Sequence, residues 1–307
     1  MRIAAIDIGT NTALLLIADI DEQGSITPIV DQLQVPRLGE ESHLSGIISA
    51  SAIKRTIAVL RKYKDLALAH SVDSIILTGT SALRDAKNRQ NVLDMIRTGI
   101  GYDVTVLNGN EEASLSFRGA LSSFPSLNDR AVVIDIGGGS TEIAYYVNNY
   151  LKTLSFPMGA VRLTERFFRD DPPQQLQISE AVQHIGKEFE RKELMDLSGK
   201  ILIGVAGTAA TLACFDQHLL DFDRSVINGY RLTQERVEHW KTKLSSLSSS
   251  QIRSLSRVAE GREDIITIGT LILYEFMRIG NFSEMIVSDR GLRYGLLLRE
   301  WEHRIKK

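Results

Sequence analysis

The residues best suited to chemistry in this 307-residue sequence lie in the segment AVVIDIGGGSTEIAYY, residues 131–146. An apolar stretch runs into an aspartate, three glycines and two hydroxyl residues. Glycines allow a backbone to approach a ligand closely, and successive N–H groups in a tight turn form a concavity that binds anions. The segment therefore predicts a phosphate-binding turn. The residues expected to line it are Gly137, Gly138, Gly139, Ser140 and Thr141.

Two carboxylates flank this turn. Asp135 ends the apolar stretch before it, and Glu142 follows its hydroxyl residues. Mg²⁺ prefers one or two carboxylates together with water and phosphate oxygens. Asp135 is therefore expected to hold a hydrated Mg²⁺, and Glu142 is a second candidate. The alternative is a tight structural turn, in which aspartate and glycine are also common.

The chain begins with a second copy of this pattern, RIAAIDIGTNTALLLIA at residues 2–18. Asp7 stands where the other copy has Asp135 and is a further metal candidate. Each copy predicts a buried strand, a turn that contains glycine and a second strand. Because both copies occur at similar strand ends, a purely structural turn is the less favoured explanation. The first turn consists of Gly9, Thr10, Asn11 and Thr12.

Two further segments carry charges that could act on a phosphate. In LNGNEEASLSF, Glu111 and Glu112 open a helix, where the helix dipole favours carboxylates. The functional alternative is that one of them orients a water molecule for attack on phosphorus. In TGTSALRDA, Arg84 either clamps a phosphate with its planar fork of donors or forms a salt bridge with Asp85 or another acid.

Composition limits the partners that the chain can bind. The 36 Lys and Arg residues nearly balance the 38 Asp and Glu residues, so no global field attracts nucleic acid or an anionic membrane. The single cysteine, Cys214, fits a reducing compartment. The apolar run at residues 13–18 is too short to span a bilayer. We therefore expect a cytoplasmic protein with no nucleic-acid or membrane partner.

The order of elements predicts an α/β protein in two lobes. Strand-like segments alternate with helical ones, such as the amphipathic stretch at residues 48–68. A chain of this length exceeds the size at which one core keeps growing. The expected division is residues 1–122, with the first turn, and residues 123–307, with the second. The last helix, at about residues 292–307, is expected to be able to pack back on the first lobe.

Eight motifs resemble, in order, those of the exopolyphosphatase/guanosine pentaphosphate phosphohydrolase family, across roughly residues 3–298. They are DIGTNT, TSALRDA, GNEEA, VIDIGGGSTE, MGAVRLTE, VAGTAATLA, GREDIITIG and VSDRGLRYGLL. The resemblance is to the short form, because longer members continue into an additional HD-like helical domain. The family belongs to the superfamily of actin, sugar kinases and chaperone ATPases.

The resemblance implies two ribonuclease-H-like lobes with an interlobe cleft that hydrolyses a terminal phosphoanhydride of polyphosphate or pppGpp. It implies that Glu112 activates the water, that Arg84 binds phosphate and that both glycine turns cradle phosphates. Asp135 and Glu142 resemble the carboxylates associated with Mg²⁺, the expected cofactor. A requirement for a monovalent cation such as K⁺ stays open. The segment GVAGTAAT, with Gly207 and Thr208, resembles a nucleotide-binding loop of the superfamily, and a homodimer is implied by the resemblance alone.

Three other functions remain to be weighed. An ATP-dependent kinase of the superfamily would need a second pocket for an acceptor. A sensor of guanosine polyphosphates would bind without turnover and would have no need of a water-orienting carboxylate. An actin-like filament rests on analogy of fold alone. For a polyphosphate substrate, a basic path is also expected along Arg162, Arg166, Arg169, Lys187, Arg191 and Lys192.

Overall fold

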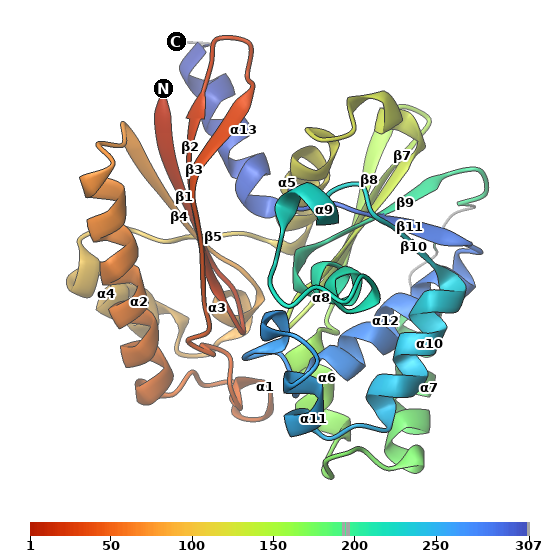
Figure 1. The fold of residues 1–307 in the computed structure, drawn as a ribbon. Helices are drawn as coiled ribbons and strands as arrows, with labels where there is room; N and C mark the ends of the chain where they lie inside the picture. The colour runs from red at the N-terminus through yellow and green to blue at the C-terminus, as the bar shows by residue number, and fades with distance from the viewer. Residues whose placement is uncertain (192–193, 195–196, 306–307) are drawn as a thin grey trace. The chain divides into compact units, whose positions relative to one another are not determined.

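The computed structural model describes residues 1–191, 194 and 197–305, so Lys192 of the expected basic path lies outside the described residues. The chain forms two compact units, of which unit 1 joins residues 1–122 to the segment that begins at Leu292, and unit 2 is residues 123–291. Each unit is built on one mixed sheet with flanking helices (Figure 1), which confirms the predicted α/β class. Along the described residues, no helix combines the length and apolar character needed to cross a membrane.

The elements of unit 1 come from both ends of the chain. They are β1 (Arg2–Ile8), β2 (Ala13–Ile20), β3 (Ile26–Gln34), α1 (Ser42–Ser45), α2 (Ala50–Ala69), β4 (Ser74–Gly79), α3 (Ser81–Asp85), α4 (Arg89–Ile100), β5 (Thr105–Val106), α5 (Gly109–Leu121) and α13 (Leu292–Ile305). Unit 2 is continuous. Its elements are η1 (Pro125–Arg130), β6 (Ala131–Ile136), β7 (Thr141–Val147), β8 (Tyr150–Phe156), α6 (Ala160–Phe167), α7 (Gln175–Arg191), β9 (Ile201–Val205), α8 (Ala206–Asp216), α9 (Arg224–Ile227), β10 (Arg231–Thr233), α10 (Gln234–Ser245), α11 (Ser249–Arg253), η2 (Arg257–Ala259), α12 (Ile266–Ile279) and β11 (Glu284–Val287).

The sheet of unit 1 has the strand order β3-β2-β1-β4-β5, and an apolar cluster lies on each of its faces. Side chains alternate between the faces of a strand. Ile6 and Ile8 of β1 therefore join the apolar cluster beneath α2 and α4, whereas Ile3 and Ala5 join the cluster with α5 and α13. The helix expected at residues 48–68 is α2, which begins after the N-cap Ser49.

Helix α13 packs against α5 and against the strands β1 and β2. The closest approach is at Gly295, where an added Cβ would lie 2.0 Å from the carbonyl oxygen of Leu115. This glycine is required because the two helix backbones nearly touch. The α5 helix is thereby fixed by a segment that follows it by about half the chain.

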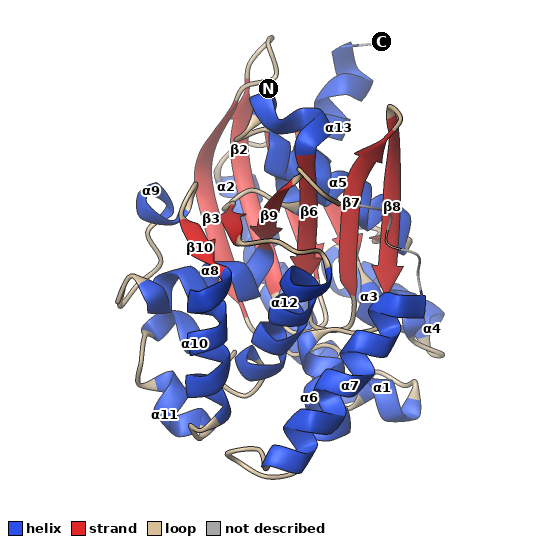
Figure 2. Ribbon diagram, turned by 90° about the vertical axis from the view of Figure 1, so that its right-hand side faces the viewer, coloured by secondary structure: helices blue, strands red, loops and turns tan. Residues whose placement is uncertain are grey.

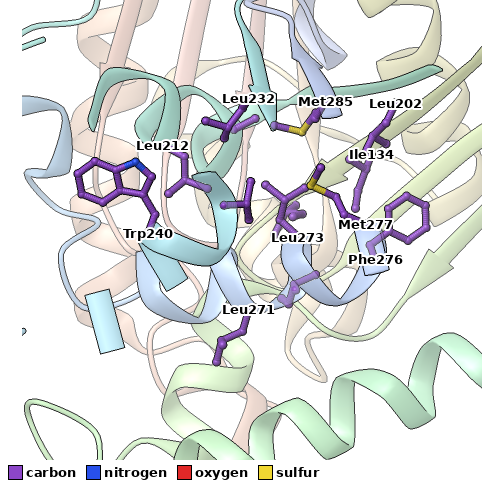
Figure 3. Packing of buried hydrophobic residues seen from close by; sticks show 14 of the residues in the cluster. Ile134, Leu202, Leu212, Leu232, Trp240, Leu271, Leu273, Phe276, Met277 and Met285 are labelled. Atoms are coloured by element: carbon purple, nitrogen blue, oxygen red, sulfur yellow. The ribbon is translucent and has the colours of Figure 1, made fainter. Parts of the chain in front are cut away.

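The sheet of unit 2 has the order β10-β11-β9-β6-β7-β8, and Figure 2 shows β9, β6, β7 and β8 side by side. One face carries the larger apolar cluster, to which Ile134 and Leu202 of the sheet and Leu212, Leu271 and Phe276 of the helices contribute (Figure 3). This core fixes the sheet against α8 and α12. The side chains on the opposite face of β6 and β7 do not belong to it.

In both units, the candidate functional segments follow parallel strands at one edge of the sheet. In unit 1, β1, β4 and β5 are parallel, so the first turn, α3 and the start of α5 all lie at their carboxyl ends. In unit 2, β6, β9 and β11 are parallel, so the second turn and the start of α8 share an edge. The carboxyl edge of such strands is where α/β proteins bind ligands.

Cys214 lies in the core of unit 2 and is fully buried. Burial raises the pKa of its thiol to about 11, and the thiolate is the reactive form. We expect a thiol-specific reagent to label Cys214 only after the protein is unfolded with denaturant. Fast labelling of the native protein at neutral pH would contradict this burial.

Candidate functional site

The second turn, residues 137–140, is held by helix α6. The predicted β6–β7 hairpin is confirmed, and Gly137 N donates to the Ser140 carbonyl at 3.0 Å. The Gly137 carbonyl accepts from Ala160 N at 2.9 Å, and the Gly138 carbonyl accepts from Val161 N at 2.8 Å. The backbone N–H groups at the start of α6 therefore donate to successive carbonyls of the turn.

The orientation of these carbonyls fixes that of the N–H groups. In a planar trans peptide, each carbonyl points away from the following N–H. Because the carbonyls of Gly137 and Gly138 point at α6, the N–H groups of Gly138 and Gly139 point away from it. Two successive N–H groups on the side of the turn opposite α6 are the arrangement that an anion-binding nest requires.

Gly159, which precedes α6, allows this packing. A Cβ on Gly159 would lie 2.5 Å from the carbonyl carbon and oxygen of Gly138 and from Ser140 N. The backbone of Gly159 is extended, with φ −138°, so the need for glycine is one of space. Arg162 completes the arrangement because its Nε donates to the Gly139 carbonyl at 2.8 Å. One member of the expected basic path thus contacts the turn directly.

Asp135 and Glu142 are directly opposed across β6 and β7, so both side chains project from the same face of the sheet. They are 9% and 1% exposed. Two neighbouring buried carboxylates repel each other when ionised, and a divalent cation would offset that repulsion. No group of three or more His, Cys, Asp or Glu side chains with a metal-binding arrangement occurs in the described part of the chain. A carboxylate pair completed by water and phosphate oxygens fits Mg²⁺.

The hydroxyl of Thr141 serves the fold. Strand alternation places Thr141 on the face opposite Glu142, where its Oγ1 donates to the Met158 carbonyl at 2.6 Å and is fully buried. The side chain expected to contact phosphate therefore fixes the start of β7 against the segment before α6. Ser140, the other hydroxyl residue, is buried within the turn itself.

The first turn, residues 9–12, has the same internal hydrogen bond, from Gly9 N to the Thr12 carbonyl at 2.9 Å. Its carbonyls are taken by the loop that follows β3: Gly39 N donates to Thr10 O at 2.8 Å and Arg37 N to Asn11 O at 3.0 Å. The side chain of Thr10 pairs with the Ser81 hydroxyl at 2.9 Å. The two turns are thus constructed alike, and the first is tied to α3.

The carboxylate pair is not repeated in unit 1. Asp7 occupies the position of Asp135, but the residue opposite it on β2 is Leu14. Asp7 lies on the face of the sheet that α5 and α13 cover, because it alternates with Ile6 and Ile8. The asymmetry favours unit 2 as the holder of a metal ion.

Arg84 and Glu112 form an ion pair in unit 1, with Nη1 of the arginine 2.8 Å from Oε2 of the glutamate. Glu112 is 7% exposed. The Arg84 guanidinium also donates to the Leu107 carbonyl at 3.2 Å, whereas Asp85 is 3.9 Å away. The pair therefore joins the two segments that the sequence singled out, and the charge-assisted bond fixes the orientation of the carboxylate.

The two glutamates at the start of α5 have different tasks. Glu111 closes a capping box, in which the side chain of Asn108 accepts from Glu111 N and the side chain of Glu111 accepts from Asn108 N. Its carboxylate is thus used by the helix terminus. Glu112 is the buried member, and the structure makes it the candidate for chemistry.

Helix α8 begins directly after β9, with Ala206 in the left-handed region at φ 63°. A Cβ on Gly207 would lie 1.8 Å from Nη1 of Arg262, so the guanidinium packs against this glycine. Burial lowers the pKa of Arg262 to about 10, which leaves it charged at neutral pH. The side chain of Thr208 faces Gly269 of α12, so its hydroxyl belongs to the packing between α8 and α12.

Gly159 and Arg262 are not among the residues that the sequence predicts for the site, although they lie in the motifs MGAVRLTE and GREDIITIG, because only three-dimensional packing shows what they contact. Arg162 is expected on the basic path, but its bond to the Gly139 carbonyl is not. Ser81 precedes Arg84 by one helical turn. Its contact with Thr10 depends on the pairing of β1 with β4.

Comparison with known proteins gives a consistent match along the chain. A model described as the Ppx/GppA phosphatase family matches residues 16–304. Exopolyphosphatase 2 of Mycobacterium tuberculosis is 31% identical, over 97% of this chain and 98% of that protein. An exopolyphosphatase structure from Cytophaga hutchinsonii has a TM-score of 0.90 at 27% identity, covering 99% of this chain and 98% of that chain. The Aquifex aeolicus Ppx/GppA family structure has a TM-score of 0.82 at 29% identity, covering 99% of this chain and 98% of that chain.

Proposed function

The chain belongs to the Ppx/GppA phosphatase family, and from this premise we propose that it is a Mg²⁺-dependent hydrolase of terminal phosphoanhydride bonds. The observation that carries the proposal is the buried Glu112 carboxylate, ion-paired with Arg84 at 2.8 Å. A binding protein gains nothing from burying a water-orienting group beside a phosphate-binding one. A hydrolase needs both.

We propose inorganic polyphosphate as the first substrate to test, because the Mycobacterium tuberculosis relative carries the name exopolyphosphatase. The second is pppGpp, which would connect the protein to the stringent response. Both offer a terminal phosphoryl group and a chain of anionic oxygens. The single cysteine of the sequence favours a reducing compartment, and we place the reaction in the cytoplasm. A homodimer is a further expectation from the resemblance.

In the proposed reaction, the N–H groups of the two glycine turns bind phosphate oxygens, and Arg84 stabilises the charge of the terminal phosphoryl group. Glu112 orients a water molecule and accepts its proton late in the reaction. The water oxygen forms a bond to phosphorus as the bond to the bridging oxygen breaks, which yields orthophosphate and a shortened substrate. Phosphoryl transfer depends mainly on positioning and charge stabilisation, so no covalent enzyme intermediate is needed.

Asp135 and Glu142 would hold Mg²⁺ through an oxygen-only donor set, with Asp7 as a further candidate. The ion would supply neutralisation of charge on the phosphate oxygens. The chain's own contribution is to bury the two carboxylates on one face of β6 and β7. A contribution from K⁺ is an expectation that the same assays can test by exchanging the monovalent salt.

The test is phosphate release by the purified protein, measured with polyphosphates of several lengths and with pppGpp in parallel, with and without Mg²⁺. We expect release that requires Mg²⁺ and is lost when Mg²⁺ is chelated. The ratio of kcat/KM values then identifies the preferred substrate. Tight binding of a guanosine polyphosphate without release would overturn the proposal in favour of a sensor. ATP consumption that depends on an added acceptor would favour a kinase.

A further inference from the structure

The candidate metal carboxylates are part of a row of residues that crosses several strands of unit 2. Asp135 on β6 is opposite Glu142 on β7, and Glu142 is opposite Ser155 on β8. Directly opposed residues project from the same face. The three side chains therefore lie side by side on that face, in the order Asp135, Glu142, Ser155.

Ser155 makes a specific contact within this row. Its hydroxyl donates to Oε1 of Glu142 at 2.7 Å. The acceptor is a carboxylate that is 1% exposed. A hydrogen bond to a charged group contributes more than one between neutral groups, and it selects one rotamer of a side chain that otherwise has three torsions.

We propose that Ser155 is a positioning residue that presents Glu142 to Mg²⁺. By donating to Oε1, Ser155 fixes the orientation of the carboxylate that would face the ion or one of its waters. Groups that orient a metal-binding carboxylate typically change metal affinity by about 10- to 100-fold when they are removed. The inference rests on the proposed function only in that it takes Mg²⁺ as the ion.

Ser155 has a carboxylate opposite it on β7, whereas the next residue on the same face of β8 does not. Thr153, two residues earlier on β8, is opposite Ala144 and therefore has no carboxylate to orient. Both side chains are half-buried on the edge strand of the sheet. Thr153→Ala is thus a matched control, because it removes a hydroxyl from the same strand and the same face without removing a contact to Glu142.

The experiment compares wild type, Ser155→Ala, Ser155→Thr and Thr153→Ala. Mg²⁺ is titrated into each protein by calorimetry in the presence of saturating orthophosphate, so that binding is measured without turnover. The Mg²⁺ dependence of polyphosphate hydrolysis is recorded separately. Thermal unfolding midpoints measured without Mg²⁺ show whether each variant is folded.

We expect Ser155→Ala to raise the Kd for Mg²⁺ about tenfold or more. Ser155→Thr keeps a hydroxyl at this position, so its Kd for Mg²⁺ should be close to that of wild type. The Kd of Thr153→Ala should also be close to that of wild type. In hydrolysis, Ser155→Ala should reach half of its maximal rate at a higher Mg²⁺ concentration than wild type. Its KM for polyphosphate at saturating Mg²⁺ should stay near that of wild type.

Several outcomes would overturn the inference: no Mg²⁺ binding by the wild type, the same Kd in Ser155→Ala and wild type, or an equal loss in Ser155→Ala and Thr153→Ala. Failure of the proposed function is a distinct result. If the wild type binds Mg²⁺ but releases no phosphate from polyphosphate or pppGpp, the hydrolase proposal fails, and the calorimetric comparison still decides the role of Ser155.

Discussion

Glu112→Gln should lower kcat for phosphate release by about 10² to 10⁴, the usual contribution of a positioned acid–base group. Glutamine has nearly the same shape, and its carbonyl oxygen can accept the hydrogen bond that Arg84 now donates to Oε2. What it cannot do is accept the proton of the attacking water. Substrate binding, measured by calorimetry with polyphosphate, should therefore persist while turnover is lost.

Glu111→Gln is the matched control for this experiment. Both substitutions remove one negative charge from the first turn of α5, where such a charge contributes about 0.3–1 kcal/mol through the helix dipole. Glutamine also maintains the capping box that Glu111 now closes. Activity close to wild type in Glu111→Gln would assign the loss to position 112. An unchanged rate in Glu112→Gln would remove Glu112 from the mechanism.

Gly159→Ala should produce the second large effect, a loss of about 10² in kcat/KM. The new Cβ would lie 2.5 Å from the backbone of Gly138 and Ser140, and no side-chain movement can relieve a clash with backbone. The turn or the start of α6 must move, and a displacement of about 1 Å at a binding element can lower the rate about 100-fold. Overpacking of this kind also costs about 1–3 kcal/mol of stability.

Gly186→Ala provides the comparison for this prediction. Gly186 lies in α7, and a Cβ there meets nothing within 4 Å, so alanine should fit and should support the helix. Activity and thermal midpoint are measured for both variants. If Gly159→Ala retained wild-type kcat/KM, the turn at residues 137–140 would not be the phosphate site. A folded Gly159→Ala protein with weak turnover is the expected result.

The strands and the two hairpins could be predicted from the sequence because their signals are local. Apolar runs ending in Asp7 and Asp135 mark buried strands, and the glycines mark turns. The same alternation of side chains could also have shown that Thr141 faces the core, since it lies one residue from Glu142 on the strand. The prediction that Thr141 contacts phosphate rested on its hydroxyl alone and did not take this alternation into account.

The remaining features depend on contacts between distant segments. Residue type alone does not separate Glu111 from Glu112, whereas in the structure Glu111 closes the capping box with Asn108 and Glu112 pairs with Arg84. The pairing of Arg84 with Glu112 requires β4 and β5 to be neighbours. The role inferred for Ser155 depends on the register of β7 and β8, which no single motif specifies. Sequence patterns identify the reactive groups, and strand register determines which of them meet.

The packing of α13 on α5 has a consequence for how the protein is made. Unit 2 is one continuous segment and can fold as soon as residue 291 has left the ribosome, since domains generally fold as units during synthesis. Residues 1–122 of unit 1 are synthesised before unit 2, but α13 is synthesised after it. The apolar surface at Leu115 and Ile3, which α13 covers in the folded protein, therefore stays exposed until then. The packing around the helix that carries Glu112 is therefore completed only after unit 2 has been synthesised, and a nascent chain should gain its activity only after residues 292–305 emerge.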